Sequence, residues 1–193
     1  MKLILSTNNL HKLREVREII GPQIELLSLS DIGFSGDIPE DQDTLEGNAS
    51  QKSHYIYNTF KENCFADDTG LEVDALCGRP GVYSARYAGA NCSDLDNMEK
   101  LLGEMDGLSN RRARFRTVIS LIIDGEETQF EGVVEGEIAE KMMGSDGFGY
   151  DAIFKPEGYD QTFAEMPLAE KNAISHRARS VAKLSGYLNL LAE

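Results

Sequence analysis

The order of hydrophobic and polar positions at the start of the chain predicts a strand, a helix and a second strand. Residues 2–6 carry a short apolar run typical of a buried strand, and residues 24–29 carry another. Between them, apolar side chains recur at helical spacing, at Leu10, Leu13, Val16 and Ile20. Gly21 and Pro22 predict the end of this helix. A strand, helix, strand order is typical of α/β proteins.

Apolar positions further along predict two more helices with a strand between them. One helix begins near Asp43 or Thr44 and has an apolar face formed by Leu45, Ala49, Ile56 and Phe60. Residues 64–66 are typical of a strand that leads into the polar segment Asp67-Asp68-Thr69-Gly70. We predict the next helix over residues 93–105.

In the second half of the chain the pattern changes to a period of two, which predicts a long hairpin. Residues 113–123 alternate between apolar and polar positions, Asp124-Gly125 is a strong turn signal, and the return strand covers residues 127–139. A short strand over 152–154 and a final helix over 175–191 complete the pattern. We therefore predict an α/β fold with a mixed sheet and flanking helices.

The composition is that of a globular protein with a strongly acidic surface. The 193 residues are 41% hydrophobic and 27% charged, which suits a single domain over residues 1–193. The 33 acidic and 19 basic residues give a formal net charge of −14. Such a surface repels nucleic acid and anionic lipid, so we expect neither as a partner. A small polyanionic substrate would need locally placed Lys or Arg side chains, helped by a metal ion.

The cysteines and the apolar runs predict a cytoplasmic protein. Cys64, Cys77 and Cys92 are an odd number without a CxxC pair, which is typical of neither a disulfide framework nor a zinc site. We expect no signal peptide, and no stretch approaches the roughly 20 apolar residues of a membrane span.

The polar segment Thr7-x-Asn9-x-x-Lys12 lies where the first strand gives way to its helix. Unpaired N–H groups and the positive end of the helix dipole suit a phosphate at such a position. Thr7 and Asn9 could donate hydrogen bonds, and Lys12 adds a positive charge. The alternative, which the spacing alone favours, is a capped helix start with a solvated lysine.

The acidic pair Asp67-Asp68, together with Glu40, is the candidate metal site. Carboxylate oxygens are usual ligands of Mg²⁺, which also keeps several waters. Adjacent strand residues point to opposite faces, so only one of the pair is expected to face a ligand. The alternative is a polar turn after the strand, and the local sequence leaves the two interpretations open.

Two further segments carry groups that suit a nucleobase. In Phe148-Gly149-Tyr150-Asp151 an aromatic ring beside a glycine could form a wall for base stacking, although a turn with a core aromatic is the simpler interpretation. Lys171, His176 and Arg177 could contact carbonyl edges or phosphate, or could be ordinary surface charge on a helix. A solvated strand face is the preferred interpretation of one arginine cluster: Arg111, Arg112, Arg114 and Arg116.

In their order, these segments closely resemble the inosine triphosphate pyrophosphatase family. The resemblance extends over about residues 3–180. It is carried by five segments: Thr7–Lys12, Ala66–Leu71, Pro80–Tyr87, Gly147–Asp151 and Lys171–Arg177. It implies an elongated mixed α/β fold with two lobes around a central cleft, usually as a homodimer. It also implies Mg²⁺-dependent hydrolysis of the deaminated purine triphosphates ITP, dITP and XTP to monophosphate and pyrophosphate, which cleanses the nucleotide pool.

The resemblance also implies roles for individual residues. The triphosphate would be held by Thr7, Asn8, Asn9, Leu10, His11, Lys12 and Lys52. Glu40 and Asp68 would hold the metal, Asp68 would be the general base, and Thr69 would contact the substrate. The base would be enclosed by Phe148, Gly149, Tyr150, Asp151, Lys171, His176 and Arg177. The neighbours of Glu40 offer other carboxylates for the metal. Ala152 departs from the proline of many relatives without removing a functional group.

Two other functions are consistent with parts of the pattern. A Maf-like pyrophosphatase acts on other nucleotides, but Asp67-Asp68-Thr69-Gly70 and Ser175-His176-Arg177 argue against it. A non-catalytic nucleotide sensor would be expected if Asp68 or Lys12 were replaced, and both are present.

Overall fold

The computed structural model describes residues 1–191, which form two compact units assembled from separate chain segments. Unit 1 consists of Met1–Asp68, Thr117–Gly132 and the chain from Arg177 on, and unit 2 consists of Thr69–Arg116 and Val133–His176. The prediction of one domain over residues 1–193 therefore stays a prediction. Three long strands contribute residues to both units.

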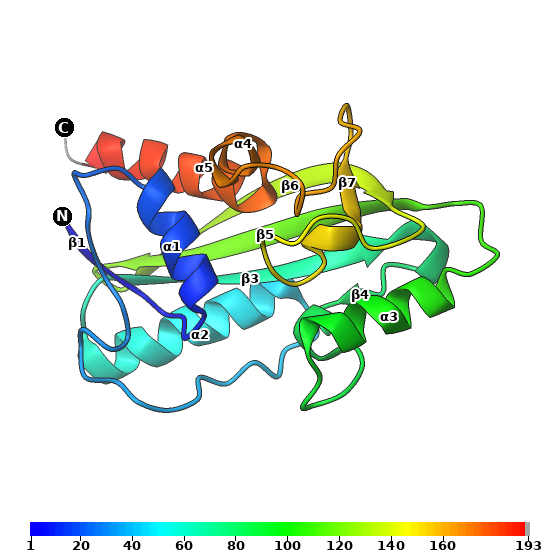
Figure 1. The fold of residues 1–193 in the computed structure, drawn as a ribbon. Coiled ribbons are helices and arrows are strands. Elements are labelled where there is room, and N and C mark those ends of the chain that lie inside the picture. Colours follow the sequence, from blue (N-terminus) through cyan, green and yellow to red (C-terminus); the bar gives the residue numbers. More distant parts are fainter. Residues whose placement is uncertain (192–193) are drawn as a thin grey trace. The chain divides into compact units, whose positions relative to one another are not determined.

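The strands form one mixed sheet, as the sequence predicts (Figure 1). They are β1 (Lys2–Leu5), β2 (Glu25–Leu27), β3 (Cys64–Val73), β4 (Pro80–Gly81), β5 (Arg112–Ile123), β6 (Glu126–Ile138) and β7 (Phe154–Pro156). The strand order is β2-β1-β3-β5-β6-β7, and β4 pairs with β3. Strand β1 runs parallel to both neighbours, with Ile4 opposite Leu27 on β2 and Cys64 on β3. Strands β4 and β7 are antiparallel to their partners.

Five α-helices accompany the sheet within the described residues: α1 (Leu10–Ile19), α2 (Leu45–Phe60), α3 (Asp94–Glu104), α4 (Leu168–Ile174) and α5 (His176–Leu191). None of the helices in this part of the chain is long and apolar enough to cross a membrane. Helix α3 begins at a capping box, in which Ser93 Oγ accepts from the backbone N–H of Asp96 and the Asp96 carboxylate accepts from that of Ser93.

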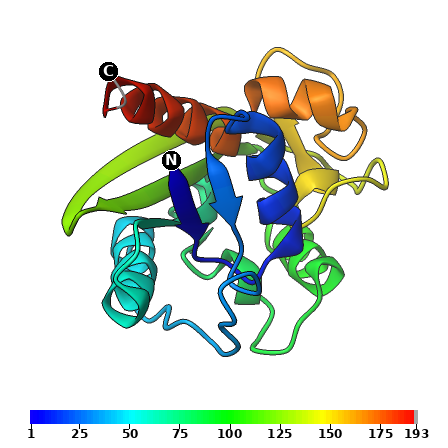
Figure 2. The ribbon, with the colours of Figure 1, turned by 90° about the vertical axis from the view of Figure 1, so that its left-hand side faces the viewer.

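In unit 1, both faces of the sheet are covered by helices (Figure 2). Leu3 and Leu5 of β1 pack in one apolar cluster with side chains of α1 and α5. Ile4, between them, packs in a second cluster with Ile56 of α2. Alternating side chains of one short strand thus fill two cores, which explains why β1 is a continuous apolar run. Unit 2 has its own core, built around Leu71, Leu101, Phe115, Phe154 and Phe163.

The hairpin turn confirms the local prediction. Strand β5 ends at Ile123 and β6 begins at Glu126. Asp124 and Gly125 between them both have positive φ, of 50° and 92°, as a two-residue turn matched to the strand twist requires.

The structure corrects the predicted course of the chain in three places. Strand β3 does not end before the acidic pair but continues through Asp67–Gly70, because both carboxylates have buried partners there. The predicted helix over 175–191 is confirmed as α5, which begins at His176, but the sequence did not predict the separate helix α4 before it, and Ser175 between the two helices has an extended backbone. The predicted strand at 152–154 begins only at Phe154, because Asp151–Ile153 form a 3-10 turn.

Candidate functional site

Asp67 and Asp68 point to opposite faces of β3 and meet different cations. Asp67 Oδ2 lies 3.0 Å from Lys12 Nζ of α1 and 3.4 Å from Arg177 Nη2 of α5. Asp68 Oδ1 lies 3.1 Å from Lys52 Nζ of α2. The expected division of the pair between two faces is confirmed, and each carboxylate belongs to a cluster of its own in unit 1.

The first cluster consists of Glu40, Asn48, Lys52 and Asp68, and we call it the Lys52 cluster. The Lys52 ammonium lies 2.6 Å from Glu40 Oε1 as well as 3.1 Å from Asp68 Oδ1. Asn48 Nδ2 donates to the other Asp68 oxygen over 3.1 Å. Burial lowers the pKa of Lys52, but the charges of Asp68 and Glu40 outweigh it, so the pKa is raised above its usual value.

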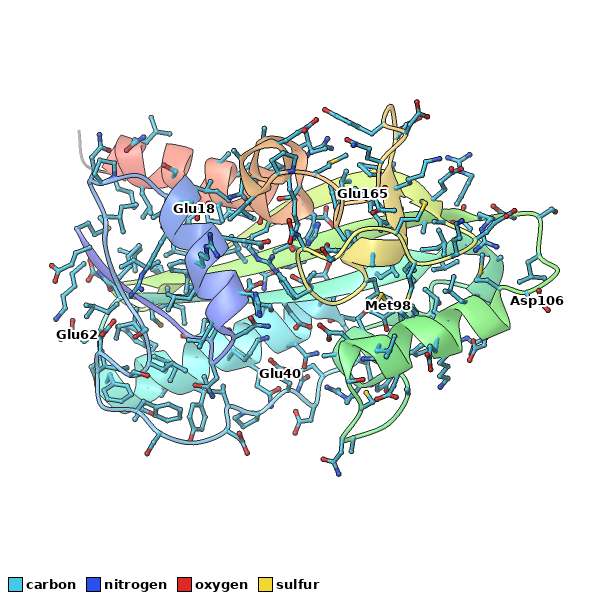
Figure 3. All side chains as sticks on the ribbon, in the orientation of Figure 1. Glu18, Glu40, Glu62, Met98, Asp106 and Glu165 are labelled. Atoms are coloured by element: carbon cyan, nitrogen blue, oxygen red, sulfur yellow. The ribbon has the colours of Figure 1, made fainter. Side chains whose placement is uncertain are left out.

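Glu40 reaches Lys52 because its chain segment is fastened to α2. The backbone N–H of Asp41 donates to Gln51 Oε1 and that of Gln42 donates to Asn48 Oδ1, over 3.2 and 2.9 Å. Gln51 Nε2 returns a 2.6 Å hydrogen bond to the Asp41 carboxylate. Glu40 therefore lies on the segment leading into α2 (Figure 3), with its own carboxylate on Lys52, whereas that of Asp41 is held by glutamine amides.

The Lys52 cluster suits a cation. Within residues 1–191, no group of three or more His, Cys, Asp or Glu side chains is arranged to hold a metal ion. Glu40 and Asp68 nevertheless bring two carboxylates to one positive group, the Lys52 ammonium. Two carboxylates plus substrate phosphate oxygens are a usual protein environment for Mg²⁺. The donor set therefore fits the metal that the sequence predicts.

The second cluster consists of Lys12, Glu15, Asp67 and Arg177, and we call it the Arg177 cluster. Arg177 is only 1% exposed, with Nη1 hydrogen-bonded to Glu15 and Nη2 to Asp67. Burial raises the pKa of Asp67, but the charges of Lys12, Arg177 and Lys52 outweigh it and hold the pKa below its usual range. Burial lowers the pKa of Lys12, and Asp67 only partly opposes this.

The Arg177 cluster contains ion pairs that the sequence did not predict. The guanidinium of Arg177 is engaged by two buried carboxylates of unit 1, and its predicted contact with the nucleobase stays a prediction. Sequence reasoning missed Glu15, which is 4% exposed. Nothing in the local pattern of α1 distinguishes Glu15 from Glu18, which forms an exposed pair with Arg14 (Figure 3).

The segment Thr7–Lys12 is organised as a capped helix start. Asn9 Oδ1 accepts from the backbone N–H groups of His11 and Lys12, over 2.9 and 3.2 Å. Thr7 Oγ1 accepts from the Asn9 N–H, and Asn8 Nδ2 donates to the carbonyl of Gly36. The helix cap is confirmed, but the lysine of that interpretation is not solvated, because the Lys12 ammonium lies 3.0 Å from Asp67 and its side chain is only 15% exposed. Contacts of this segment with phosphate stay a prediction. Leu10 is 76% exposed, which does not suit a core residue.

In unit 2, three of the residues predicted to enclose a base lie together. Lys171 Nζ is 2.7 Å from Asp151 Oδ2, and both side chains are buried. The same Asp151 oxygen accepts from the Phe148 N–H over 2.9 Å, and the ammonium lies 5.0 Å from the centre of the Phe148 ring. Phe148 is half-buried, so this group offers an aromatic face beside a held cation.

The other predicted base contacts in unit 2 have structural partners. Tyr150 is a buried core residue whose hydroxyl donates to the Ser84 carbonyl over 2.9 Å. The Gly149 N–H donates to Asp94 Oδ2 over 2.7 Å. His176 stacks on Phe115 with ring centres 4.6 Å apart. Thr69 is half-buried in β3. For Tyr150, the interpretation as a core aromatic in a turn is therefore confirmed.

Gly147 permits the pairing of Asp151 with Lys171. Its φ is +79°, and a Cβ at this position would stand 2.1 Å from Asp151 Oδ2. We expect Gly147→Ala to lower the free energy of unfolding by at least about 1 kcal/mol more than Gly149→Ala does, because the displaced carboxylate leaves a buried ammonium poorly paired. Gly149 is the matched control, since its φ of +62° is similar and no atom lies within 4 Å of its added Cβ. Urea unfolding measures the free energy of unfolding of both variants. Equal losses would show that the Asp151 side chain does not depend on the absence of a Cβ at position 147.

Proteins of known family that are similar to this chain cover nearly its full length. The sequence pattern of the Ham1 family matches residues 3–187. The dITP/XTP pyrophosphatase of Flavobacterium johnsoniae is 51% identical over 184 residues, which are 95% of this chain and 96% of that protein. The dITP/XTP pyrophosphatase of Bacillus subtilis is 47% identical over 189 residues and covers 96% of each chain.

Solved structures give the same result. The Ham1 protein of Staphylococcus aureus superimposes with a TM-score of 0.89 at 39% identity, and the HAM1 protein of Coxiella burnetii with a TM-score of 0.90 at 36% identity. Each superposition covers 98% of both chains. These agreements confirm the mixed sheet with flanking helices. The chain belongs to the Ham1 family.

Proposed function

We propose that this chain is a hydrolase that cleaves ITP, dITP and XTP to the monophosphate and pyrophosphate. Its relatives named dITP/XTP pyrophosphatase align over nearly the whole chain. The observation that carries the proposal is the Lys52 cluster, which joins a buried cation to two carboxylates in a chain of net charge −14. That combination suits a reaction in which a polyanion meets an activated water. Removing deaminated triphosphates would keep them out of DNA and RNA.

Asp68 is the proposed general base for the water that attacks the α-phosphorus. Asn48 and Lys52 of α2 hold its two oxygens, so the carboxylate on β3 has a fixed orientation. Phosphoryl transfer depends mainly on positioning and on neutralising charge. Lys52 and Lys12 would supply that charge to the triphosphate, as we predict for the segment Thr7–Lys12.

Mg²⁺ is the proposed cofactor, and Glu40 and Asp68 are the residues that would hold it. When bound, the ion supplies charge neutralisation and orientation to the triphosphate oxygens. The protein itself fixes the positions of the two carboxylates. Gln51 and Asn48 fasten the Glu40 segment to α2, and Asn48 also orients Asp68.

Base recognition is proposed for the group Phe148, Asp151 and Lys171, with His176. Hypoxanthine and xanthine carry a 6-oxo acceptor where adenine carries an amino donor, and xanthine has a 2-oxo acceptor where guanine has an amino donor. A site that presents donors therefore accepts the deaminated bases and sets donor against donor for adenine and guanine. The resemblance that implies these contacts also leads us to propose a cytoplasmic homodimer.

The proposal is tested by measuring pyrophosphate release from ITP, XTP, ATP and GTP under one condition. We expect kcat/KM for ITP and XTP to exceed that for ATP and GTP by at least about 10²-fold, because mismatched hydrogen bonds in a built site discriminate strongly. Hydrolysis of ATP or GTP within tenfold of ITP would contradict the donor-site account. Tight binding of ITP without pyrophosphate release would instead indicate a nucleotide sensor.

A further inference from the structure

The Lys52 ammonium stands where a metal ion would be expected. It contacts Glu40 Oε1 at 2.6 Å and Asp68 Oδ1 at 3.1 Å, so one cation already joins the two carboxylates proposed for Mg²⁺. The second Asp68 oxygen accepts from Asn48 Nδ2 at 3.1 Å. Both oxygens of Asp68 are therefore engaged by donors from α2.

The same oxygens cannot readily serve the lysine and a divalent ion together. Mg²⁺ binds oxygen at about 2.0–2.1 Å and demands near-octahedral geometry. An ion on Glu40 Oε1 and Asp68 Oδ1 would lie within a few ångströms of the ammonium. Lys52 and Asp68 are 3% and 7% exposed, and the Glu40 side chain is 40% exposed, so water screens the repulsion between these positive charges only in part.

The formal charges of the Lys52 cluster also favour a divalent cation in place of the Lys52 ammonium. Glu40 and Asp68 with Lys52 carry one net negative charge, whereas the two carboxylates alone carry two, which one divalent cation balances. Lys12 does not replace Lys52 in this balance, because its ammonium is paired with Asp67 on the other face of β3.

We propose that Lys52 and the divalent cation compete for Glu40 and Asp68, and that the lysine occupies the metal site until the triphosphate of a substrate attracts it away. This inference rests on the metal site of the proposed function. Its consequence is that the metal binds weakly to the free protein and tightly only together with the nucleotide. Lys52 then couples the arrival of substrate to the assembly of the metal site.

The inference is tested by measuring the binding of Mn²⁺ alone, without nucleotide, by calorimetry and by the electron paramagnetic resonance of free Mn²⁺. We expect Lys52→Met and Lys52→Gln to bind Mn²⁺ at least about tenfold more tightly than the unmodified chain, because a like charge next to the ion is removed. Lys52→Arg keeps the charge and should not tighten binding. Gln retains a donor for the carboxylates, so it serves if the Met variant fails to fold.

Two controls separate this inference from the function on which it rests. Lys183 lies in unit 1 and donates to the Glu131 carbonyl, so Lys183→Met changes the net charge equally and should leave Mn²⁺ affinity unchanged. Adding Asp68→Asn to Lys52→Gln should abolish the gain. Unchanged affinity in both neutral variants, or an equal gain in Lys52→Arg or Lys183→Met, would overturn the competition. A gain that survives Asp68→Asn would instead overturn the proposed metal site.

Discussion

Replacing Asp68 with Asn is expected to lower kcat for pyrophosphate release from ITP by about 10²–10⁴-fold, the usual effect of losing a general base. The amide has nearly the same shape, but it is a poor base and a weaker metal ligand. Folding should be largely kept, because Lys52 retains Glu40 and the new amide oxygen can still accept from Asn48. Steady-state kinetics gives the rate, and thermal unfolding followed by circular dichroism checks the fold. Turnover close to that of the unmodified chain would remove Asp68 from the chemistry.

Replacing Asp67 with Asn is expected to lower the free energy of unfolding by about 3–5 kcal/mol, the cost of breaking a buried ion pair. Asp67 is fully buried and faces Lys12 and Arg177, so the substitution leaves positive charges in the interior with less compensation. The control is Glu18→Gln, which breaks an exposed pair with Arg14 and should cost less than about 1 kcal/mol. Urea unfolding measures both free energies. A loss for Asp67→Asn no larger than for Glu18→Gln would contradict the buried cluster.

The pH dependence of stability gives a second readout for Asp67. Its folded-state pKa is lowered, after the charges of Lys12, Arg177 and Lys52 outweigh burial, and therefore lies below the ordinary value near 4 of the unfolded chain. A carboxyl of this kind contributes stability that is fully present above the unfolded pKa and is lost as the pH falls toward the folded pKa. Asp67→Asn should thus flatten the acid limb of the stability curve.

The two substitutions together test whether the neighbouring carboxylates of β3 have different roles, one in catalysis and one in stability. We expect Asp68→Asn to affect mainly the rate and Asp67→Asn mainly the stability, because the two carboxylates face different clusters. A large loss of stability for Asp68→Asn with full stability for Asp67→Asn would reverse the assignment. Since Lys12 is held by Asp67, some loss of substrate affinity in Asp67→Asn is consistent with the proposal.

Features that depend on neighbouring residues could be predicted from the sequence. Asn9 caps the start of helix α1, Ser93 caps the start of α3, and the hairpin turns at Asp124 and Gly125. Each is fixed by hydrogen bonds or dihedral angles within about four residues, so the local pattern contains the necessary information. The order of the motifs along the chain also predicted the family, which the comparisons confirmed.

Features that depend on distant partners were decided only by the tertiary structure. The acidic pair continues a strand rather than ending one because Lys12, Lys52 and Arg177 arrive from other elements to neutralise it. Glu15 and Arg177 are 162 residues apart along the chain, and no local period links them. A buried charge is stable only where a partner is brought to it, so the packing of α1, α2 and α5 on the sheet, rather than the local pattern, determined which charged residues form the two clusters.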